Sequence, residues 1–135
     1  MSYWIARVIL WTIAAFYAYG ALVHVINILG LSGFSWIDAP AKWRILDLVY
    51  LVLDIAVVIG ILVRSLIGYV ALVVAAVSQI FLYTVFRDWI VDVPKPFTRT
   101  PEEIAYLDML VTFHVVTLFL FCFALWIGRG PTRTI

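Results

Sequence analysis

Four long apolar stretches, separated by short polar breaks, dominate the pattern of this chain. They cover about residues 3–29, 43–63, 66–86 and 104–127. Each holds about 20 residues or more, and at about 1.5 Å per residue a helix of that length crosses a hydrocarbon core of about 30 Å. Transmembrane β-strands would need period-two alternation, which these stretches lack. The pattern therefore predicts an all-α fold, a four-transmembrane-helix up-down bundle that forms a single membrane domain over residues 1–135.

The polar breaks carry local signals for helix ends. Thr100 can cap the fourth helix, Pro101 suits its first position, and Glu103 can complete a capping box. Arg64 and Ser65 are the clearly polar residues between the second and third stretches. We therefore expect these two helices to form a tight antiparallel hairpin.

The break between the first and second stretches is itself apolar for a loop. Residues 30–41 include Trp36, and Trp43 follows closely. Because tryptophan concentrates at membrane–water interfaces, we expect this segment to lie in the interface, anchored by these two side chains.

Composition narrows the class of protein further. The chain is 66% hydrophobic and 13% charged, with a mean hydropathy of +1.12, which is too apolar for a soluble domain of this size. A net charge of +1 gives no electrostatic footprint for nucleic acid. The expected partners are the lipid bilayer and other membrane subunits or further copies of the chain. The single cysteine, Cys122, has no partner for an intrachain disulfide.

The charged residues give a prediction for orientation. One side of the expected bundle carries Arg7, Arg64, Arg129 and Arg133 with no acid beside them. The other side carries slightly more basic residues, but they are mixed with acids. A bare count favours the second side as cytoplasmic, yet the short, purely basic hairpin reads as an internal turn. We expect both termini to be cytoplasmic, in a bacterial inner membrane or its equivalent.

The candidate chemistry lies in ionisable residues within these apolar stretches. A charge at the centre of a span costs at least roughly 2.5–3.5 kcal/mol, so such residues face one another, a partner or water. Counting depth along each helix predicts a midplane layer with one residue from each helix, and an outer layer nearer one surface. The midplane layer comprises Tyr17, Asp54, Gln79 and His114. The outer layer comprises His24, Asn27, Asp47, Tyr83 and Asp108.

Helical spacing supports inward faces for most of these residues. Asp47 and Asp54 are seven apart, nearly two turns, and so share a face, as do Tyr17 and His24. Asp108 is six residues from His114, about 120° away, so those two side chains cannot both point at the bundle axis. Asp47 also lies near the headgroup level, with Arg44 three residues away on the same face as an expected ion-pair partner.

Two interpretations of these layers remain open. Alternating carboxylate and imidazole groups suit the movement of protons or the binding of a cation. For the layers as a whole the pattern favours a second interpretation, in which the same groups hydrogen-bond one another and fix the register of the helices, each contact contributing about 0.6 kcal/mol. Asp54 is the residue that we would most readily call functional, because it lies deep with no cation nearby in sequence.

The two histidines make haem and a metal ion the candidate cofactors. A single haem held by His24 and His114 is disfavoured, since their depths differ by about six residues, or about 9 Å. A metal site made of His24, Asp47 and Asp108 is geometrically easier, although no closely spaced ligand motif supports it.

The sequence leaves three functions open. It contains no G-x-S-x-G, phosphate loop or Cys-x-x-Cys motif, which favours a non-catalytic protein. Its size and small polar parts favour an accessory or assembly subunit of a larger membrane complex. The alternatives are an oligomeric proton or cation channel or transporter, and a haem- or metal-binding membrane redox protein.

Overall fold

The computed structural model describes residues 2–128, and every regular element in this part is a helix. The predicted all-α helical bundle is confirmed. Four of the helices are long and apolar enough to cross a membrane, as expected for an integral membrane protein. The helices are α1 (Ser2–Ile28), α2 (Ala41–Leu62), α3 (Leu66–Thr84), the short α4 (Arg87–Val91) and α5 (Pro101–Gly128).

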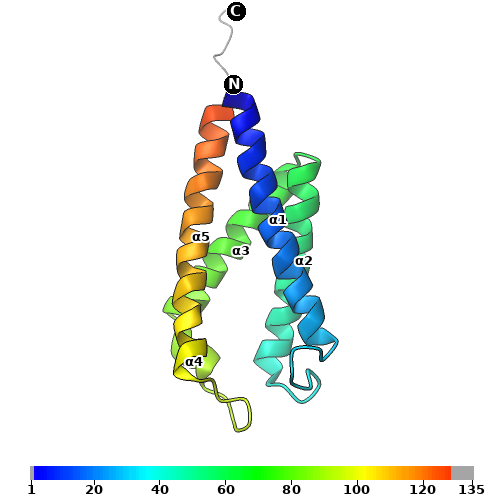
Figure 1. Ribbon diagram of the computed structural model, residues 1–135, viewed down its shortest axis with the longest axis vertical. Helices are drawn as coiled ribbons and strands as arrows, with labels where there is room; N and C mark the ends of the chain where they lie inside the picture. The colour runs from blue at the N-terminus through cyan, green and yellow to red at the C-terminus, as the bar shows by residue number, and fades with distance from the viewer. Residues whose placement is uncertain (1, 129–135) are drawn as a thin grey trace, which may run out of the picture.

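The long helices form a ring in which α1 and α3 each pack against both α2 and α5. Figure 1 shows α1 and α5 close together near Ser2 and Gly128, and diverging toward the connections at the other end. We call the first end, which also carries the α2–α3 turn, the termini end. We call the opposite end, with the connecting segments 29–40 and 92–100, the loop end. The bundle is thus narrow at the termini end and wide at the loop end.

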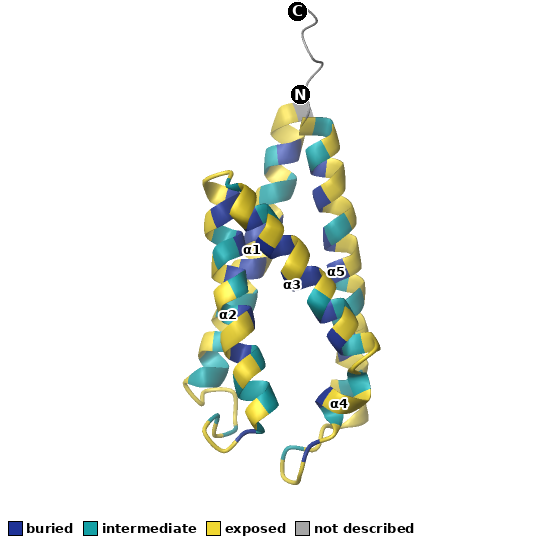
Figure 2. Cartoon of the chain, turned by 180° about the vertical axis from the view of Figure 1, so that it is seen from behind, coloured by how far each residue is buried: buried dark blue, intermediate teal, exposed yellow. Residues whose placement is uncertain are grey.

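The half of the bundle next to the termini end is a closely packed apolar core. Val57, Leu72 and Ala75 have no measurable exposure, and Ile13 of α1 and Phe121 of α5 pack with them. Figure 2 shows the buried residues on the faces that the helices turn toward one another, with exposed residues on the outside. The exposed residues include many large apolar side chains, as expected for a surface that lipid tails cover.

Two glycines allow α2 and α3 to touch. A Cβ atom built on Gly60 would lie 2.1 Å from the Cα of Gly68, so the two backbones are in direct contact. The turn between the helices is short, and the hydroxyl of Ser65 caps α3 by accepting from the backbone N–H of Ile67 at 3.2 Å. The tight hairpin expected from the sequence is confirmed.

The start of α5 follows its sequence signal. The backbone N–H of Thr100 donates to Oε2 of Glu103 at 2.8 Å, and the N–H of Glu103 donates to Oγ1 of Thr100 at 3.3 Å. This is the reciprocal capping box.

The third helix differs from expectation, because it ends at Thr84 rather than at residue 86, and the separate helix α4 follows it. The connection from α3 to α5 therefore contains the short helix α4. Hydropathy alone did not distinguish its start from the end of the third apolar stretch.

Candidate functional site

The loop half of the bundle encloses a cavity of about 750 Å³. All four long helices, α4 and both long connecting segments contribute to its wall, which is largely apolar and aromatic. Every residue of the two expected polar layers lines this cavity except Asp108. The widening of the bundle thus creates one space that the midplane and outer layers share.

Asp47 is the centre of a hydrogen-bonded cluster near the loop end. Its Oδ1 lies 2.8 Å from Nδ1 of His24 and accepts from Nδ2 of Asn27 at 3.2 Å. Its Oδ2 accepts from the indole N–H of Trp36 at 3.0 Å. The ion pair expected between Asp47 and Arg44 does not occur among residues 2–128; the Arg44 guanidinium lies over the Trp36 ring instead, 6.0 Å from its centroid. Asp47 is therefore buried and joins α1 to the segment that precedes α2.

His24 connects this cluster to the deeper layer. Its Nδ1 faces Asp47, and its Nε2 lies 3.9 Å from Oδ2 of Asp54, one face of the ring being stacked on Tyr50. The two aspartates are separated by about 10 Å along α2, and the imidazole spans the space between them. The division into two separate layers is therefore incomplete, because one histidine contacts a carboxylate of each.

Asp54 packs against a glycine of α1. A Cβ built on Gly20 would lie 2.6 Å from Oδ2 of Asp54, so only glycine leaves room for the carboxylate at this place. The other oxygen, Oδ1, is buried and has no hydrogen-bond partner among the described residues. A buried carboxylate oxygen without a partner is costly in an apolar medium.

His114 lies on the opposite wall, where it contacts α3. Its Nε2 is 2.9 Å from Oε1 of Gln79, which also accepts from the hydroxyl of Tyr83 at 3.4 Å. Because the amide oxygen only accepts, Nε2 carries the proton and Nδ1 is left with a lone pair. That Nδ1 is buried without a partner in the described part of the chain, and so is the hydroxyl of Tyr17, whose ring centroid is 6.4 Å from that of His114.

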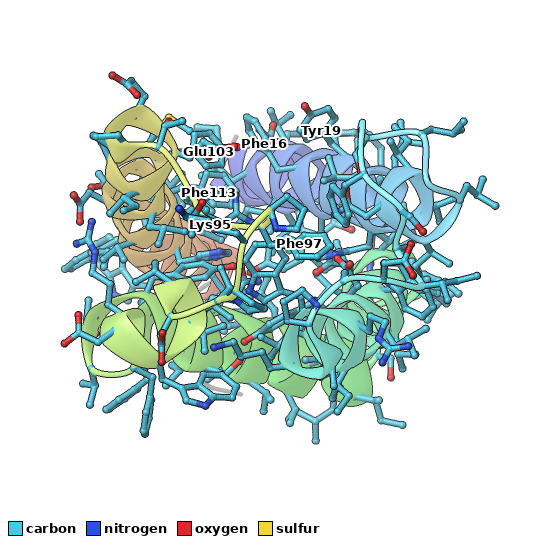
Figure 3. All side chains as sticks on the ribbon, turned by 90° about the horizontal axis from the view of Figure 1, so that it is seen from below. Phe16, Tyr19, Lys95, Phe97, Glu103 and Phe113 are labelled. Atoms are coloured by element: carbon cyan, nitrogen blue, oxygen red, sulfur yellow. The ribbon has the colours of Figure 1, made fainter. Side chains whose placement is uncertain are left out.

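The loop end of the cavity is covered by three aromatic rings from separate segments. Phe34, Trp43 and Phe97 meet edge to face, with centroids 6.1–6.4 Å apart. The Arg99 guanidinium lies 4.5 Å from the Trp43 centroid, and the indole N–H of Trp43 donates to the carbonyl of Ile90 at 3.0 Å. Figure 3, seen from the loop end, shows Phe97 near the middle of the view, over the space between the helices. The two connecting segments thus cover part of this end of the cavity, where the lining residues Thr98 and Arg99 remain exposed.

The side of the cavity between α1 and α5 is less enclosed. Phe16 and Tyr19 of α1 and Met109 of α5 line the cavity, yet each is more than half exposed. Phe16 touches Phe113 across the two helices, with centroids 5.4 Å apart, and Figure 3 shows both on the same side of the bundle. Lining residues from these two helices are thus also on the outer surface, so the cavity is open on the side between α1 and α5.

Asp108 belongs to neither the cavity nor the polar cluster. Its carboxylate accepts from both terminal nitrogens of Arg87, at 2.6 and 3.1 Å, on the outside of the bundle. This hydrogen bond raises the pKa of the Arg87 guanidinium above its ordinary value. The expectation that Asp108 and His114 cannot both face the axis is confirmed, since His114 is buried and Asp108 is exposed.

The proposed ligand sets for a cofactor are not assembled. Among residues 2–128 no group of three or more His, Cys, Asp and Glu side chains could hold a metal ion, and Asp108 is remote from His24 and Asp47. For haem, His24 has its ring nitrogens toward two carboxylates, and the Nε2 of His114 is bound to Gln79. This arrangement gives a haem held by both histidines no support.

Comparison with known proteins adds no family assignment to this geometry. No protein-family model, curated protein or solved structure matches the chain.

Sequence reasoning missed several residues that shape the site. Gly20 and Trp36 were not singled out as partners of the aspartates, and Phe34 and Phe97 were not expected to form a cover. A signal for Gly20 was present, because Tyr17, Gly20 and His24 follow one another at helical spacing on one face of α1. The aromatic cover brings Phe97 against two residues that lie more than 50 positions earlier, so no local pattern could have indicated it.

Replacing Asp47 by alanine should lower the stability of the bundle. Three polar groups lose their common acceptor, and at about 0.6 kcal/mol for each contact the total is about 2 kcal/mol. Thermal unfolding of the detergent-solubilised protein measures this. Asp38→Ala is the matched control, because Asp38 is exposed and its side chain has no hydrogen bond in the described structure. An equal effect of both changes would contradict the role given to Asp47.

Proposed function

We propose that this protein binds an amphipathic, lipid-soluble molecule in the cavity of its loop half. The head group of that molecule occupies the deep end, at Tyr17, Asp54 and His114, and its apolar part extends toward the mouth between α1 and α5. The observation that carries the proposal is the set of three buried polar atoms at one level of the cavity that have no hydrogen-bond partner among the described residues.

The dimensions and lining of the cavity suit such a ligand. Binding sites for small molecules commonly have volumes of about 300–1,000 Å³, with mostly apolar walls and a few polar groups that fix orientation. Here the volume is about 750 Å³. A lateral mouth between two apolar helices favours a molecule that partitions into the membrane over one that arrives from water.

The polar atoms define the chemistry of the head group. Oδ1 of Asp54 and Nδ1 of His114 are lone-pair acceptors, and the hydroxyl of Tyr17 is a donor. A complementary head group therefore offers two donors and an acceptor. A phenolic ring with two hydroxyls, such as a hydroquinone, has this pattern, and its flat ring matches a wall rich in aromatic side chains.

The other functions expected from the sequence have less support. A proton or cation pathway through a single chain must continue beyond Asp54, but beyond that level the interior is the apolar core around Val57 and Leu72. A role as an accessory subunit, with cytoplasmic termini, stays a prediction, because an exposed apolar surface suits lipid and protein partners alike. We propose a non-catalytic binding role, since no residue arrangement in the cavity resembles a nucleophile with its base.

Two matched probes test this proposal. The first is a decyl-substituted hydroquinone, and the second is its dimethyl ether, which keeps the ring and tail but lacks donors. We expect saturable binding of the hydroquinone, at least about tenfold tighter than the ether, because the ether leaves two buried acceptors unpaired. Isothermal titration of the protein in mild detergent measures both affinities.

The outcomes separate the parts of the proposal. Equal affinities would contradict the head-group assignment, and absence of saturable binding by either probe would overturn the binding function itself. Decanol, which has a tail but no ring, controls for non-specific partition into the detergent.

A further inference from the structure

A second pocket lies at the termini end, on the opposite side of the apolar core from the cavity. It has a volume of about 270 Å³ and lies between the first turns of α1, the α2–α3 turn and the last turns of α5. Its charged residues are Arg7 and Arg64, and its aromatic residues are Tyr3, Trp11 and Tyr69. Tyrosine and tryptophan around arginine are typical of the membrane interface, where phospholipid headgroups lie.

Arg7 is held among aromatic rings with no acid beside it. The centre of its guanidinium group is 4.6 Å from the Trp11 centroid, 5.2 Å from that of Trp4 and 5.9 Å from that of Tyr3. Its Nε is buried and has no hydrogen-bond partner among residues 2–128. The rings fix the position of the guanidinium group, but they cannot accept strong hydrogen bonds from its N–H groups.

Arg64 reaches the same pocket from a strained backbone position. Its φ is +57°, a left-handed conformation that favours glycine and costs other residues on the order of 1 kcal/mol. Its terminal nitrogen donates to the hydroxyl of Tyr3 at 2.6 Å, and the guanidinium centre lies 5.6 Å from the Tyr3 centroid. An arginine at a position where glycine would be more stable points to a use for its side chain.

The charge distribution leaves both arginines without counterions in the part of the chain that the structure describes. All eight acidic residues lie between positions 38 and 108. They belong to the loop half of the helices or to the connecting segments at the loop end. Among the described residues, neither Arg7 nor Arg64 forms an ion pair. Two guanidinium groups that converge on Tyr3 at a membrane surface therefore form a site for an anion from outside the chain.

We infer that Arg7 and Arg64 bind a phosphate group at the termini end. Guanidinium groups bind phosphate oxygens through paired N–H groups, and the surrounding tyrosine and tryptophan rings contact the glycerol and first methylenes of a lipid. The phosphate of an anionic phospholipid and a free phosphate ion share this chemistry. The site is independent of the cavity at the loop end, because the apolar core separates them.

Native mass spectrometry of the full-length protein in mild detergent tests the inference. The probes are phosphatidylglycerol, phosphatidylcholine, whose ammonium group competes for the phosphate, and inorganic phosphate. We expect phosphatidylglycerol to bind at least tenfold tighter than phosphatidylcholine at low salt, with the difference shrinking as salt rises. Binding of inorganic phosphate as tightly as of phosphatidylglycerol would assign the site to a free anion. Equal binding of both lipids with no binding of phosphate would overturn it.

Arg64→Gly is the decisive variant, because it removes the side chain and relieves the backbone. We expect its melting temperature to be equal to or above that of the parent protein, while its affinity for phosphatidylglycerol falls at least tenfold. Lys95→Gln, which removes one exposed positive charge at the loop end, is the matched control and should leave that affinity unchanged. Retained affinity in Arg64→Gly, or an equal loss in Lys95→Gln, would refute the site.

Discussion

Replacing Gly60 by alanine should be among the most destabilising single changes in this protein. The new methyl carbon would lie 2.1 Å from the Cα of Gly68 and 2.7 Å from its backbone nitrogen. Both of those atoms are backbone, so no side-chain rotation can relieve the clash, and α2 and α3 must move apart. Since these helices share the core around Val57 and Leu72, we expect a loss of at least about 3 kcal/mol. The folded yield and the melting temperature in detergent measure this loss.

Gly128→Ala provides the matched control, since it is the same change in another helix of the same end. A Cβ at Gly128 would lie 3.5 Å from the Cβ of Ala6, which is ordinary van der Waals contact. Alanine is favoured over glycine in a helix by about 1 kcal/mol. We therefore expect Gly128→Ala to be neutral or stabilising. If Gly60→Ala behaved in the same way, the direct contact between α2 and α3 would be wrong.

Replacing Asp54 by leucine should abolish the preference of the cavity for a donor-bearing head group. Leucine branches at the same carbon as aspartate, but its methyl groups are bulkier than the carboxylate oxygens, so α1 must shift slightly over Gly20. The substitution removes the acceptor Oδ1, and the affinity for the decyl hydroquinone should fall at least about tenfold, whereas affinity for the dimethyl ether should change less than about threefold. Removal of the buried carboxylate favours stability and the crowding over Gly20 opposes it, so we expect a melting temperature close to that of the parent protein.

Asp108→Leu tests whether this effect belongs to the cavity. Asp108 is also an aspartate within a membrane helix, but it is exposed and paired with Arg87 outside the bundle. We expect this variant to bind both probes as the parent protein does. If Asp108→Leu lowered the affinity for the hydroquinone, or if Asp54→Leu did not, the assignment of the head group to Asp54 would be contradicted.

The fold could be predicted from sequence because the bilayer simplifies the problem. A helix must satisfy its own backbone groups in hydrocarbon, so length and hydropathy were enough to define the four spans. The capping box at Thr100 and Glu103 and the α2–α3 hairpin follow from residues that are neighbours in the chain. Helix α4 was missed because its apolar residues continue the pattern of α3 without a clear break.

The candidate site could be predicted only in part. Depth counting found most of the polar residues that line the cavity, because antiparallel helices joined at the same end bring matching positions together. Depth counting assigned His24 to the outer layer and Asp54 to the midplane layer, although their side chains approach each other. It took no account of the tilt of α1 or of the length of the histidine side chain. It paired Asp47 with Arg44 on its own helix, whereas burial favoured donors from α1 and the connecting segment. Cavity volume depends on how far helices diverge, and no pattern within one helix encodes that.

The unequal lengths of the long helices have a consequence for the surrounding bilayer. At about 1.5 Å per residue, the 28 residues of α5 extend about 42 Å, whereas the 19 residues of α3 extend about 28 Å. A hydrocarbon layer of about 30 Å matches α3 but not α5, so the α1–α5 flank must tilt, or the membrane must thicken locally beside it. Lipids around the protein therefore experience two different thicknesses.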